Sequence, residues 1–173
     1  DADPRPPAAR RDGADEREAE IAGFSWVSPT LAGLPRPGRS GDLASDLAFV
    51  ASQDVHTLVS LTEAGLPKDT VAGHGMASQH IPVVDFQPPT QAQFDRFLAL
   101  LAEAADTKTK IAVHCEAGRG RTGTMLAASF IAGGMTADEA LTVIRRLRPG
   151  SVETPGQEQA LAELASRLRS AHD

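Results

Sequence analysis

The chain has 173 residues, and 41% of them are apolar by a count that omits glycine. With the 15 glycines this share reaches about 50%, which is the composition of an ordinary globular domain. No apolar run approaches the roughly 20 residues of a membrane span, and the first residues lack the basic and then apolar pattern of a signal peptide. These features exclude a membrane-spanning protein, a collagen, a disulfide scaffold and a coiled coil.

The net charge is −6, from 17 basic and 23 acidic side chains, and the aromatic side chains are six Phe and one Trp. Such a chain repels nucleic acid as a whole and has no aromatic platform for bases, so we expect no nucleic-acid partner. The single cysteine, Cys115, permits no intrachain disulfide and suits a reducing, cytoplasmic location. We expect a monomer without a membrane span.

Residues 1–20 are Pro, Ala and charged side chains with almost nothing to bury, which predicts a disordered tail. Residues 21–173 are then a single domain. Its first element is an edge hairpin, predicted from short apolar stretches at 24–27 and 30–32. The other predicted elements are a helix at 42–52, strands at 55–61 and 80–84, a helix that begins after a Thr90–Gln93 capping box, a strand at 111–114, and helices at 122–131, 137–147 and 155–170.

This order of elements predicts an α/β fold with a central, largely parallel sheet flanked by helices. The predicted core-facing residues of two of the helices are Phe94, Phe97, Leu98, Leu101, Leu141, Ile144 and Leu147. In such sheets, ligands bind beyond the carboxyl ends of the strands. Three strands end there in polar residues, namely Thr62-Glu63, Asp85 and Cys115. A site is therefore expected where these ends meet.

Residues 114–124, HCEAGRGRTGT, lie between a buried strand and a helix. Glycines at 118, 120 and 123 let the backbone curl so that successive N–H groups point inward, as in an anion-binding nest. The helix that follows adds its free N–H groups, and Arg121 adds a planar fork that matches two phosphate oxygens. The loop therefore predicts a site for a phosphoryl group.

Cys115 would sit at the centre of this positive cup, where the thiolate is favoured over the thiol. A lone cysteine is otherwise a small buried hydrophobe. The other phosphate loop, G-x-x-x-x-G-K-[ST], does not occur, and one Cys with scattered His has no zinc-ligand spacing. We expect neither a metal nor a cofactor.

The pattern H-C-x5-R-[ST] resembles the signature of the cysteine-dependent protein-tyrosine-phosphatase superfamily. Further segments resemble the small atypical dual-specificity phosphatases of the VHZ type, over most of residues 24–160. They are FSWV with LAGLPRPG, LVSLTEAG, HIPVVDFQPPT, HCEAGRGRTGTML and IRRLRPGSVET. The resemblance implies a dual-specificity-phosphatase fold and a two-step reaction through a cysteinyl-phosphate. Glu116, Arg119 and the charged amino-terminal segment depart from the better-known pattern.

The resemblance also implies roles. Cys115 is the nucleophile, Arg121 and the loop amides stabilise the transition state, and Thr122 helps the sulfur to leave. The phosphate-binding residues are Glu116, Ala117, Gly118, Arg119, Gly120 and Arg121. His114 either supports the loop and thiolate from behind or is a satisfied core histidine.

Asp85 lies 30 residues before the nucleophile, in a segment stiffened by Pro88-Pro89. This spacing resembles the general-acid loop of dual-specificity enzymes, although an Asp after a strand is otherwise a turn or cap residue. Glu153 is a candidate to order the loop through Arg121, or else a solvated carboxylate.

Other candidates have plainer alternatives. Gln157 either positions water or only caps its helix, and Glu63 is a further acid near the strand ends. The cluster Arg145, Arg146 and Arg148 is either a solvated face, which is the commoner case, or part of a helix with one end toward the cleft.

The predicted function is a phosphomonoesterase acting on phosphotyrosine and phosphoserine/threonine in proteins. Nothing in the chain resembles the Tyr-bearing motif that deepens the cleft of strictly tyrosine-specific phosphatases, so the resemblance implies a shallow cleft that accepts both kinds of substrate. One alternative is a phosphatase for phosphoinositides or inositol phosphates. Arg119 would favour it by reaching a neighbouring phosphate, and the charge of Glu116 would oppose it. The second alternative is a phosphate-binding pseudoenzyme.

Overall fold

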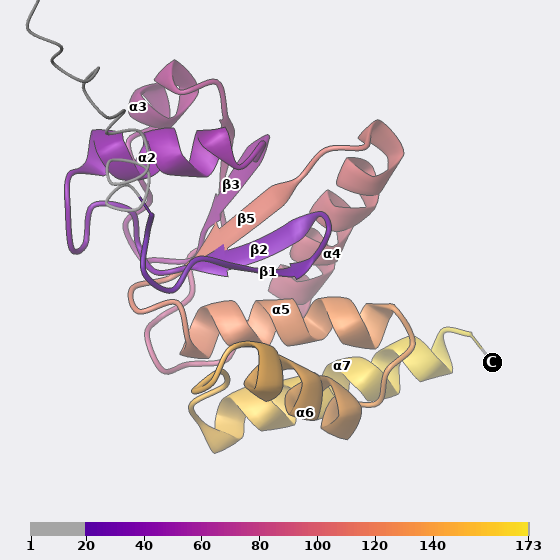
Figure 1. Ribbon diagram of the computed structural model, residues 1–173. Coiled ribbons are helices and arrows are strands. Elements are labelled where there is room, and N and C mark those ends of the chain that lie inside the picture. The colour runs from indigo at the N-terminus through magenta and orange to yellow at the C-terminus, as the bar shows by residue number, and fades with distance from the viewer. Residues whose placement is uncertain (1–19, 173) are drawn as a thin grey trace, which may run out of the picture.

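The computed structural model describes residues 20–172, so the tail predicted for residues 1–20 lies outside the described residues except for Glu20. Strands and helices alternate along most of the chain (Figure 1). The elements are β1 Ser25–Ser28, β2 Leu31–Leu34, α2 Leu43–Ser52, β3 Thr57–Ser60, α3 Lys68–Gly73, β4 Ala77–His80, α4 Gln91–Thr107, β5 Ile111–His114, α5 Gly120–Ala132, α6 Ala137–Leu147 and α7 Pro155–Ser170.

One five-stranded sheet with the order β1-β2-β5-β3-β4 forms the centre of the fold. Only β1 and β2 pair antiparallel, as an edge hairpin; the other neighbours are parallel. His114 of β5 is in register with Leu34 of β2 and with Ser60 of β3. The predicted α/β fold with a largely parallel sheet and an amino-terminal hairpin is confirmed, and three strands end at one edge.

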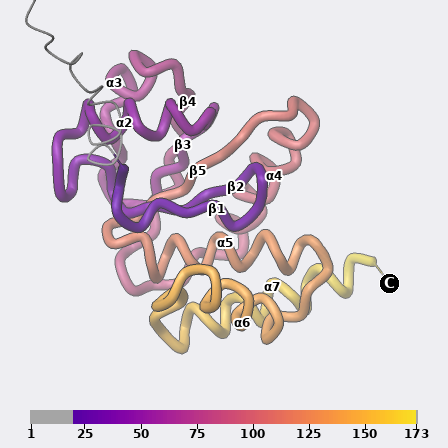
Figure 2. Tube along the Cα trace, in the orientation of Figure 1, coloured from indigo at the N-terminus to yellow at the C-terminus, as the bar shows by residue number. Residues whose placement is uncertain are grey.

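Successive side chains of a strand point to opposite faces, and the sheet is covered on both faces, so the side chains of β3 and β5 alternate between two hydrophobic cores. Leu58 and Ala112 point into a core with α2, whereas Val59 and Val113 point into a larger core with the helices of the other face. Figures 1 and 2 show α2 and α3 on one side of the sheet and α5 on the other, with α6 and α7 packed beyond α5. The two layers hold the strand ends that carry the site.

Helix starts follow the predicted capping chemistry. Thr90 with Gln93 forms a capping box at α4, and Thr154 with Gln157 forms one at α7. In each box the threonine hydroxyl accepts from the third backbone N–H of the helix, and the glutamine side chain accepts from the N–H of the cap residue. Thr136 caps α6 by accepting from Glu139 N.

Two predicted elements differ from the structure. The strand predicted at 80–84 is wrong: β4 covers Ala77–His80, and the residues after it are extended without a ladder. Pro82 has no N–H to donate, so the ladder stops there, although Ile81 N and Val83 N still donate to Ser60 O and Leu61 O. The six-residue helix α3 falls in a segment predicted as a loop, because Val71 is its only buried residue.

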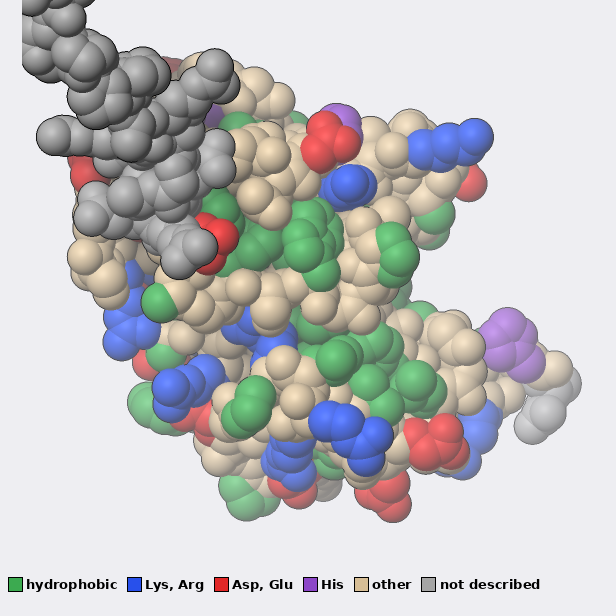
Figure 3. Space-filling view, in the orientation of Figure 1, with side chains coloured by type: hydrophobic (Ala, Val, Ile, Leu, Met, Phe, Trp, Pro, Cys, Tyr) green, Lys and Arg blue, Asp and Glu red, His purple; other side chains and the backbone are tan. Residues whose placement is uncertain are grey.

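The prediction that Leu147 faces the core is also wrong, since it is 46% exposed at the last turn of α6. The face of the molecule in Figure 3 mixes hydrophobic and charged side chains, with Lys and Arg spread over several elements rather than gathered in one patch. None of the helices within residues 20–172 has the length and apolar character needed to span a membrane.

Candidate active site

The candidate site lies where β2, β3 and β5 end. His114 is the last residue of β5, Cys115 follows it, and α5 begins at Gly120. The loop between them passes beside the end of β2, where a Cβ atom on Gly118 would lie 2.7 Å from the carbonyl carbon of Leu34 and from Pro35 N. Gly118 also has a φ of +75°, a conformation that other residues adopt only with strain. Two independent constraints, the positive φ and the close packing against β2, therefore require glycine at this position.

Neighbouring groups hold the carbonyl groups of this loop. His114 Nδ1 lies 3.0 Å from Cys115 O, and Arg36 N and Arg39 Nη1 donate to Glu116 O at 3.0 and 3.1 Å. A trans peptide sets the C=O of one residue opposite the N–H of the next. The amides of Glu116 and Ala117 therefore point away from these donors.

The second half of the loop is held in the same way. Arg148 Nη2 donates to Gly118 O at 2.7 Å, and Gly123 N donates to Arg119 O at 2.8 Å. The amides of Arg119 and Gly120 consequently point away from the surrounding elements, toward the inside of the turn. Together with the first turn of α5, these backbone N–H groups are the ones that the glycine pattern predicts for an anion-binding nest.

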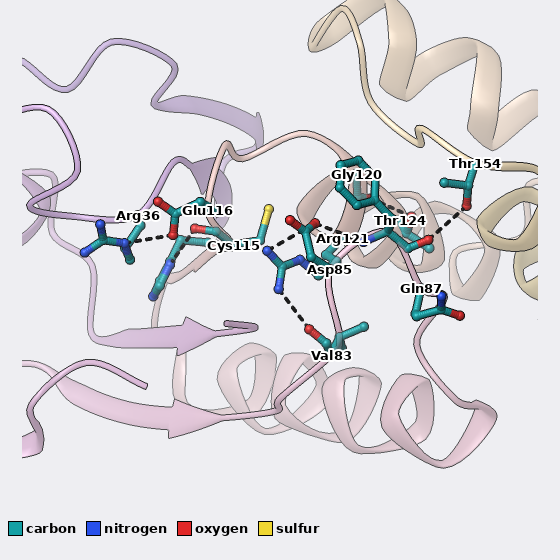
Figure 4. Close-up of polar contacts among 12 residues, drawn as sticks. Arg36, Val83, Asp85, Gln87, Cys115, Glu116, Gly120, Arg121, Thr124 and Thr154 are labelled. Atoms are coloured by element: carbon teal, nitrogen blue, oxygen red, sulfur yellow. Dashed lines mark hydrogen bonds and ion pairs between the residues drawn. The ribbon is translucent and has the colours of Figure 1, made fainter. Parts of the chain in front are cut away.

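Arg121 is 4% exposed, and its guanidinium bridges the loop to the segment that follows β4. Its Nη1 donates to Val83 O at 2.8 Å, and its Nη2 lies 3.4 Å from Asp85 Oδ1 (Figure 4). Its buried Nε has no hydrogen-bond partner among the described residues, and neither has the buried hydroxyl of Thr122. Buried polar groups are seldom left unpaired, and the third such atom within residues 20–172 is Arg148 Nε. Of the three, Arg121 Nε and Thr122 Oγ1 belong to the motif that the sequence predicts to bind a phosphoryl group.

Cys115 is 3% exposed and lies at the start of the loop. Figure 4 places its sulfur between Glu116 and the pair formed by Asp85 and Arg121.

His114 is fully buried behind the loop, and burial lowers its pKa to about 4. The ring is therefore neutral near pH 7. Because Cys115 O can only accept, Nδ1 carries the proton, and Nε2 accepts from the hydroxyl of Ser60 at 2.7 Å. His114 contacts the carbonyl of the proposed nucleophile, so it supports the loop and satisfies its own hydrogen bonds at the same time.

Asp85 is half exposed at the mouth of the site, and its Oδ1 accepts from Phe86 N at 2.9 Å. The residues after it are tied to the start of α7. Thr154 Oγ1 donates to Phe86 O at 3.3 Å, and Gln157 Nε2 donates to Gln87 O at 3.4 Å. The segment that carries the proposed acid is thus anchored to the carboxyl-terminal half of the chain.

A cleft of about 540 Å³ opens beside the loop. Its charged lining comprises Arg36, Glu63, Asp85, Glu116 and Arg121. Glu116 in this lining is paired: its Oε2 lies 2.9 Å from Arg36 Nε, and its Oε1 lies 3.8 Å from Arg39 Nε. The repulsion predicted between Glu116 and a polyanionic substrate is therefore weakened, because two guanidinium groups offset the charge of that carboxylate.

The side chain of Arg119 does not line this cleft. It packs over Gly150, where a Cβ atom would lie 3.4 Å from its Cδ, and it lines a second cavity with Leu147 and Pro149. The expected reach of Arg119 toward a neighbouring phosphate is not seen in this arrangement.

The remaining predicted residues lie around the loop. Glu153 presses against it, since a Cβ atom on Gly120 would lie 2.5 Å from Glu153 Oε1, but the carboxylate paired with Arg121 is that of Asp85. Gln157 is buried and caps α7 while it holds the acid-bearing segment. Glu63 is exposed on the rim of the cleft.

Sequence reasoning missed the residues that hold the loop from outside, which are Arg36, Arg39, Ser60 and Arg148. The solvated face predicted for the arginine cluster is wrong for Arg148, which is 9% exposed. Arg145 also reaches inward, to Ser151 O and Val152 O. The available signal was the motif RPG that follows α6, whose glycine has a φ of +87° and turns the chain back toward the loop.

Comparison with known families bears on this geometry. Residues 21–161 match the model of the family described as "PTP-SAK: Swiss Army Knife protein, DSP-PTPase phosphatase domain". The chain belongs to this family. It is a domain of the cysteine-based dual-specificity phosphatases, as the loop motif and its surrounding segments predicted.

Individual relatives agree. The Tyrosine-protein phosphatase CDC14 homolog of Schizosaccharomyces pombe is 28% identical over 80% of this chain, which spans only 28% of that protein's length. The crystal structure of Tk-PTP in the active form is 30% identical, with a TM-score of 0.76 over 86% of this chain and 99% of that chain. The crystal structure of PTPMT1 in complex with PI(5)P is 18% identical, with a TM-score of 0.76 over 87% and 99% of the two chains, and shows a shared fold.

Proposed function

We propose that this domain hydrolyses phosphomonoesters through a cysteinyl-phosphate intermediate, without a metal ion, and that its substrates are phosphotyrosine and phosphoserine/threonine in proteins. The observation that supports it most directly is the loop around Cys115. Its carbonyl groups accept from neighbouring donors, its amides face the opposite way, and the buried guanidinium of Arg121 is paired with Asp85 at the mouth of the site. Such preorganised donors stabilise the charge of a transferring phosphoryl group without reorganisation.

In the first step the Cys115 thiolate attacks phosphorus, so that a sulfur–phosphorus bond forms and the bond to the ester oxygen breaks. The leaving oxygen takes a proton from Asp85 and departs as an alcohol. The three non-bridging oxygens are held by the loop amides and by the fork of Arg121.

In the second step a water molecule attacks the phosphocysteine. Asp85, now a carboxylate, takes a proton from this water, and the sulfur leaves as a thiolate. The hydroxyl of Thr122 is a donor available to stabilise that sulfur, since it is buried without another partner among residues 20–172. The products are an alcohol and inorganic phosphate, and the enzyme returns to its starting state.

Cys115→Ser tests the nucleophile. The serine hydroxyl is a much weaker nucleophile than the cysteine sulfur, so turnover of an aryl phosphate should fall by several orders of magnitude. Inorganic phosphate should still bind to the variant, as measured by its competition with a bound probe. A covalent phosphoenzyme trapped by acid quench from the wild-type chain should be missing from the variant. More than about one-tenth of wild-type turnover in Cys115→Ser would refute the assignment.

A second candidate substrate is a phosphorylated inositol or phosphoinositide. The observation that favours it is the pairing of Glu116 with Arg36 and Arg39, which removes a repulsion at the rim of the cleft. PTPMT1, which shares the fold, is described in complex with PI(5)P. Side-by-side rates on phosphopeptides and inositol phosphates, under chelation, separate the two classes. Absence of turnover on every phosphomonoester would instead support a phosphate-binding pseudoenzyme.

A further inference from the structure

Arg148, the residue that ends α6, is a charged side chain buried among neutral groups. Its Nη1 donates to Gly23 O at 2.9 Å, Ser25 Oγ at 2.6 Å and Gly33 O at 2.9 Å. Its Nη2 donates to Gly118 O at 2.7 Å. No carboxylate of the described residues pairs with it, so its charge is solvated by dipoles and not cancelled.

The bond to Gly118 O fixes one peptide of the phosphate loop. Because this carbonyl points to Arg148, the N–H of Arg119 points the other way, toward the inside of the turn. Gly118 itself has a φ of +75° and packs against the end of β2. Without the guanidinium this peptide would lose the donor that selects its orientation, and one of the amides that face phosphate would be free to turn.

The amino-terminal hairpin is shaped around Arg148. A Cβ atom on Gly33 of β2 would lie 2.8 Å from Leu126 Cδ1, 3.0 Å from Thr122 Cγ2 and 3.1 Å from Arg148 Cζ, so a side chain there would displace α5 or the guanidinium. Gly23 O and Ser25 Oγ, just before and at the start of β1, complete the set of acceptors. The hairpin and the loop thus meet at one side chain.

We infer that Arg148 is a positioning residue of the active site, which orients the Arg119 amide toward the inside of the loop, and that through it the hairpin β1–β2 contributes to catalysis. The inference rests on the proposed function for its catalytic meaning. The hairpin is then a working part of the site and not only an edge of the sheet.

The test compares Arg148→Met, which removes the charge, with Arg148→Lys, which keeps the charge but lacks the fork. Two readouts are used: the rate of Cys115 alkylation by iodoacetamide, and the inhibition of that alkylation by inorganic phosphate. Arg148→Met should weaken phosphate inhibition about tenfold or more, because the loop loses the donor that orients the Arg119 amide. Arg148→Lys should also weaken phosphate inhibition, although less, because it keeps a donor but lacks the fork. Arg146→Met, an exposed arginine on the same helix, is the matched control and should change neither readout.

Ser25→Ala extends the test if Arg148→Met fails to fold. It removes an acceptor of the guanidinium on the hairpin, so it should weaken phosphate inhibition severalfold in a chain whose circular dichroism matches wild type. Unchanged phosphate inhibition in the folded variants would overturn the inference. So would losses that only follow the unfolded fraction. Both readouts are independent of turnover, so a wild-type chain that hydrolyses no phosphomonoester would refute the proposed function while the role of Arg148 is still decided.

Discussion

Asp85 Oδ1 lies 3.4 Å from Arg121 Nη2, so the proposed acid and the proposed phosphate ligand form a pair across the mouth of the site. Arg121 is almost fully buried, whereas Asp85 is half exposed. A phosphate dianion offers the guanidinium two oxygens at once, which is a stronger contact than one distant carboxylate oxygen. Substrate binding should therefore draw Arg121 to the phosphate and leave Asp85 facing the oxygen that departs.

Asp85→Asn should lower kcat by about 10²–10⁴ for alkyl phosphates, which is the scale of general acid catalysis. The loss should shrink for aryl phosphates with acidic leaving groups, because these depart without a proton. Steady-state rates over a series of leaving groups measure the effect, with Asp106→Asn on the exposed side of α4 as a control that should match wild type. An equal loss across the series would make Asp85 structural, and Glu63 or Glu153 would become the acid to test.

Gly118→Ala should inactivate the loop. Its Cβ would lie 2.7 Å from the backbone of Leu34 and Pro35, and backbone atoms of a parallel strand cannot move aside cheaply. The loop must then shift, and a displacement of about 1 Å at a reacting centre can cost about 10²-fold in rate. We expect at least this loss in kcat/KM.

Gly134→Ala is the matched comparison for that change. Gly134 also has a positive φ, of +111°, but nothing lies within 4 Å of its Cβ position. This variant should lose about 1–3 kcal/mol of stability through backbone strain and keep the wild-type rate. Equal rates for the two alanine variants in the folded state would show that close packing at Gly118 does not matter for activity.

The phosphate loop was predictable because its signals are local. Glycines at fixed offsets, two arginines and one cysteine lie within eleven residues of the chain, between a strand and a helix that were both predicted. Asp85 was predictable from its position before the Pro88-Pro89 pair, even though the strand assigned in front of it was wrong. The segment 81–84 is apolar like a strand, but Pro82 breaks the ladder, and that outcome depends on pairing with β3 and not on local composition.

The donors that hold the loop could not be predicted in this way. Arg36 and Arg148 lie 80 and 30 residues from their acceptors in the loop, and their roles come from sheet topology. An arginine at the end of an amphipathic helix has the same sequence pattern whether it is solvated or buried under a loop. Whether Arg148 is solvated or buried is decided by the position of the β1–β2 hairpin beside the carboxyl-terminal end of α6.

The neutral state of His114 predicts how stability depends on pH. Its folded-state pKa is about 4, against an ordinary value of 6.5. Between these values the unfolded chain binds a proton that the folded chain does not, so the free energy of unfolding falls as pH drops from 6.5 to 4. The full loss is about 3 kcal/mol.

Urea unfolding of wild type and His114→Asn at pH 7, 5.5 and 4 measures this dependence. The asparagine amide can donate to Cys115 O but cannot titrate, so the variant should be less stable at pH 7 and should lose less stability on acidification. The carboxylates titrate in both chains, so their contribution cancels in the difference. Parallel curves for the two chains would show that His114 is protonated without cost.

Glu116→Gln should change substrate preference rather than chemistry. The carboxylate is paired with Arg36 and Arg39 at the surface, where its side chain is 43% exposed, so the loss of the pairs should cost less than about 1 kcal/mol of stability. Removing it leaves two guanidinium groups beside the cleft without their counter-charge. A second phosphate about 4 Å away in water-like surroundings gains about 1 kcal/mol, which corresponds to about fivefold in kcat/KM.

A bisphosphorylated inositol should therefore gain about fivefold in kcat/KM relative to a singly phosphorylated peptide. Glu163→Gln, a change to an exposed acid on α7, should leave this ratio of the two substrates unchanged. A ratio that stays constant in Glu116→Gln would show that Arg36 and Arg39 serve only to hold the loop, and would leave the phosphoprotein assignment as the stronger one.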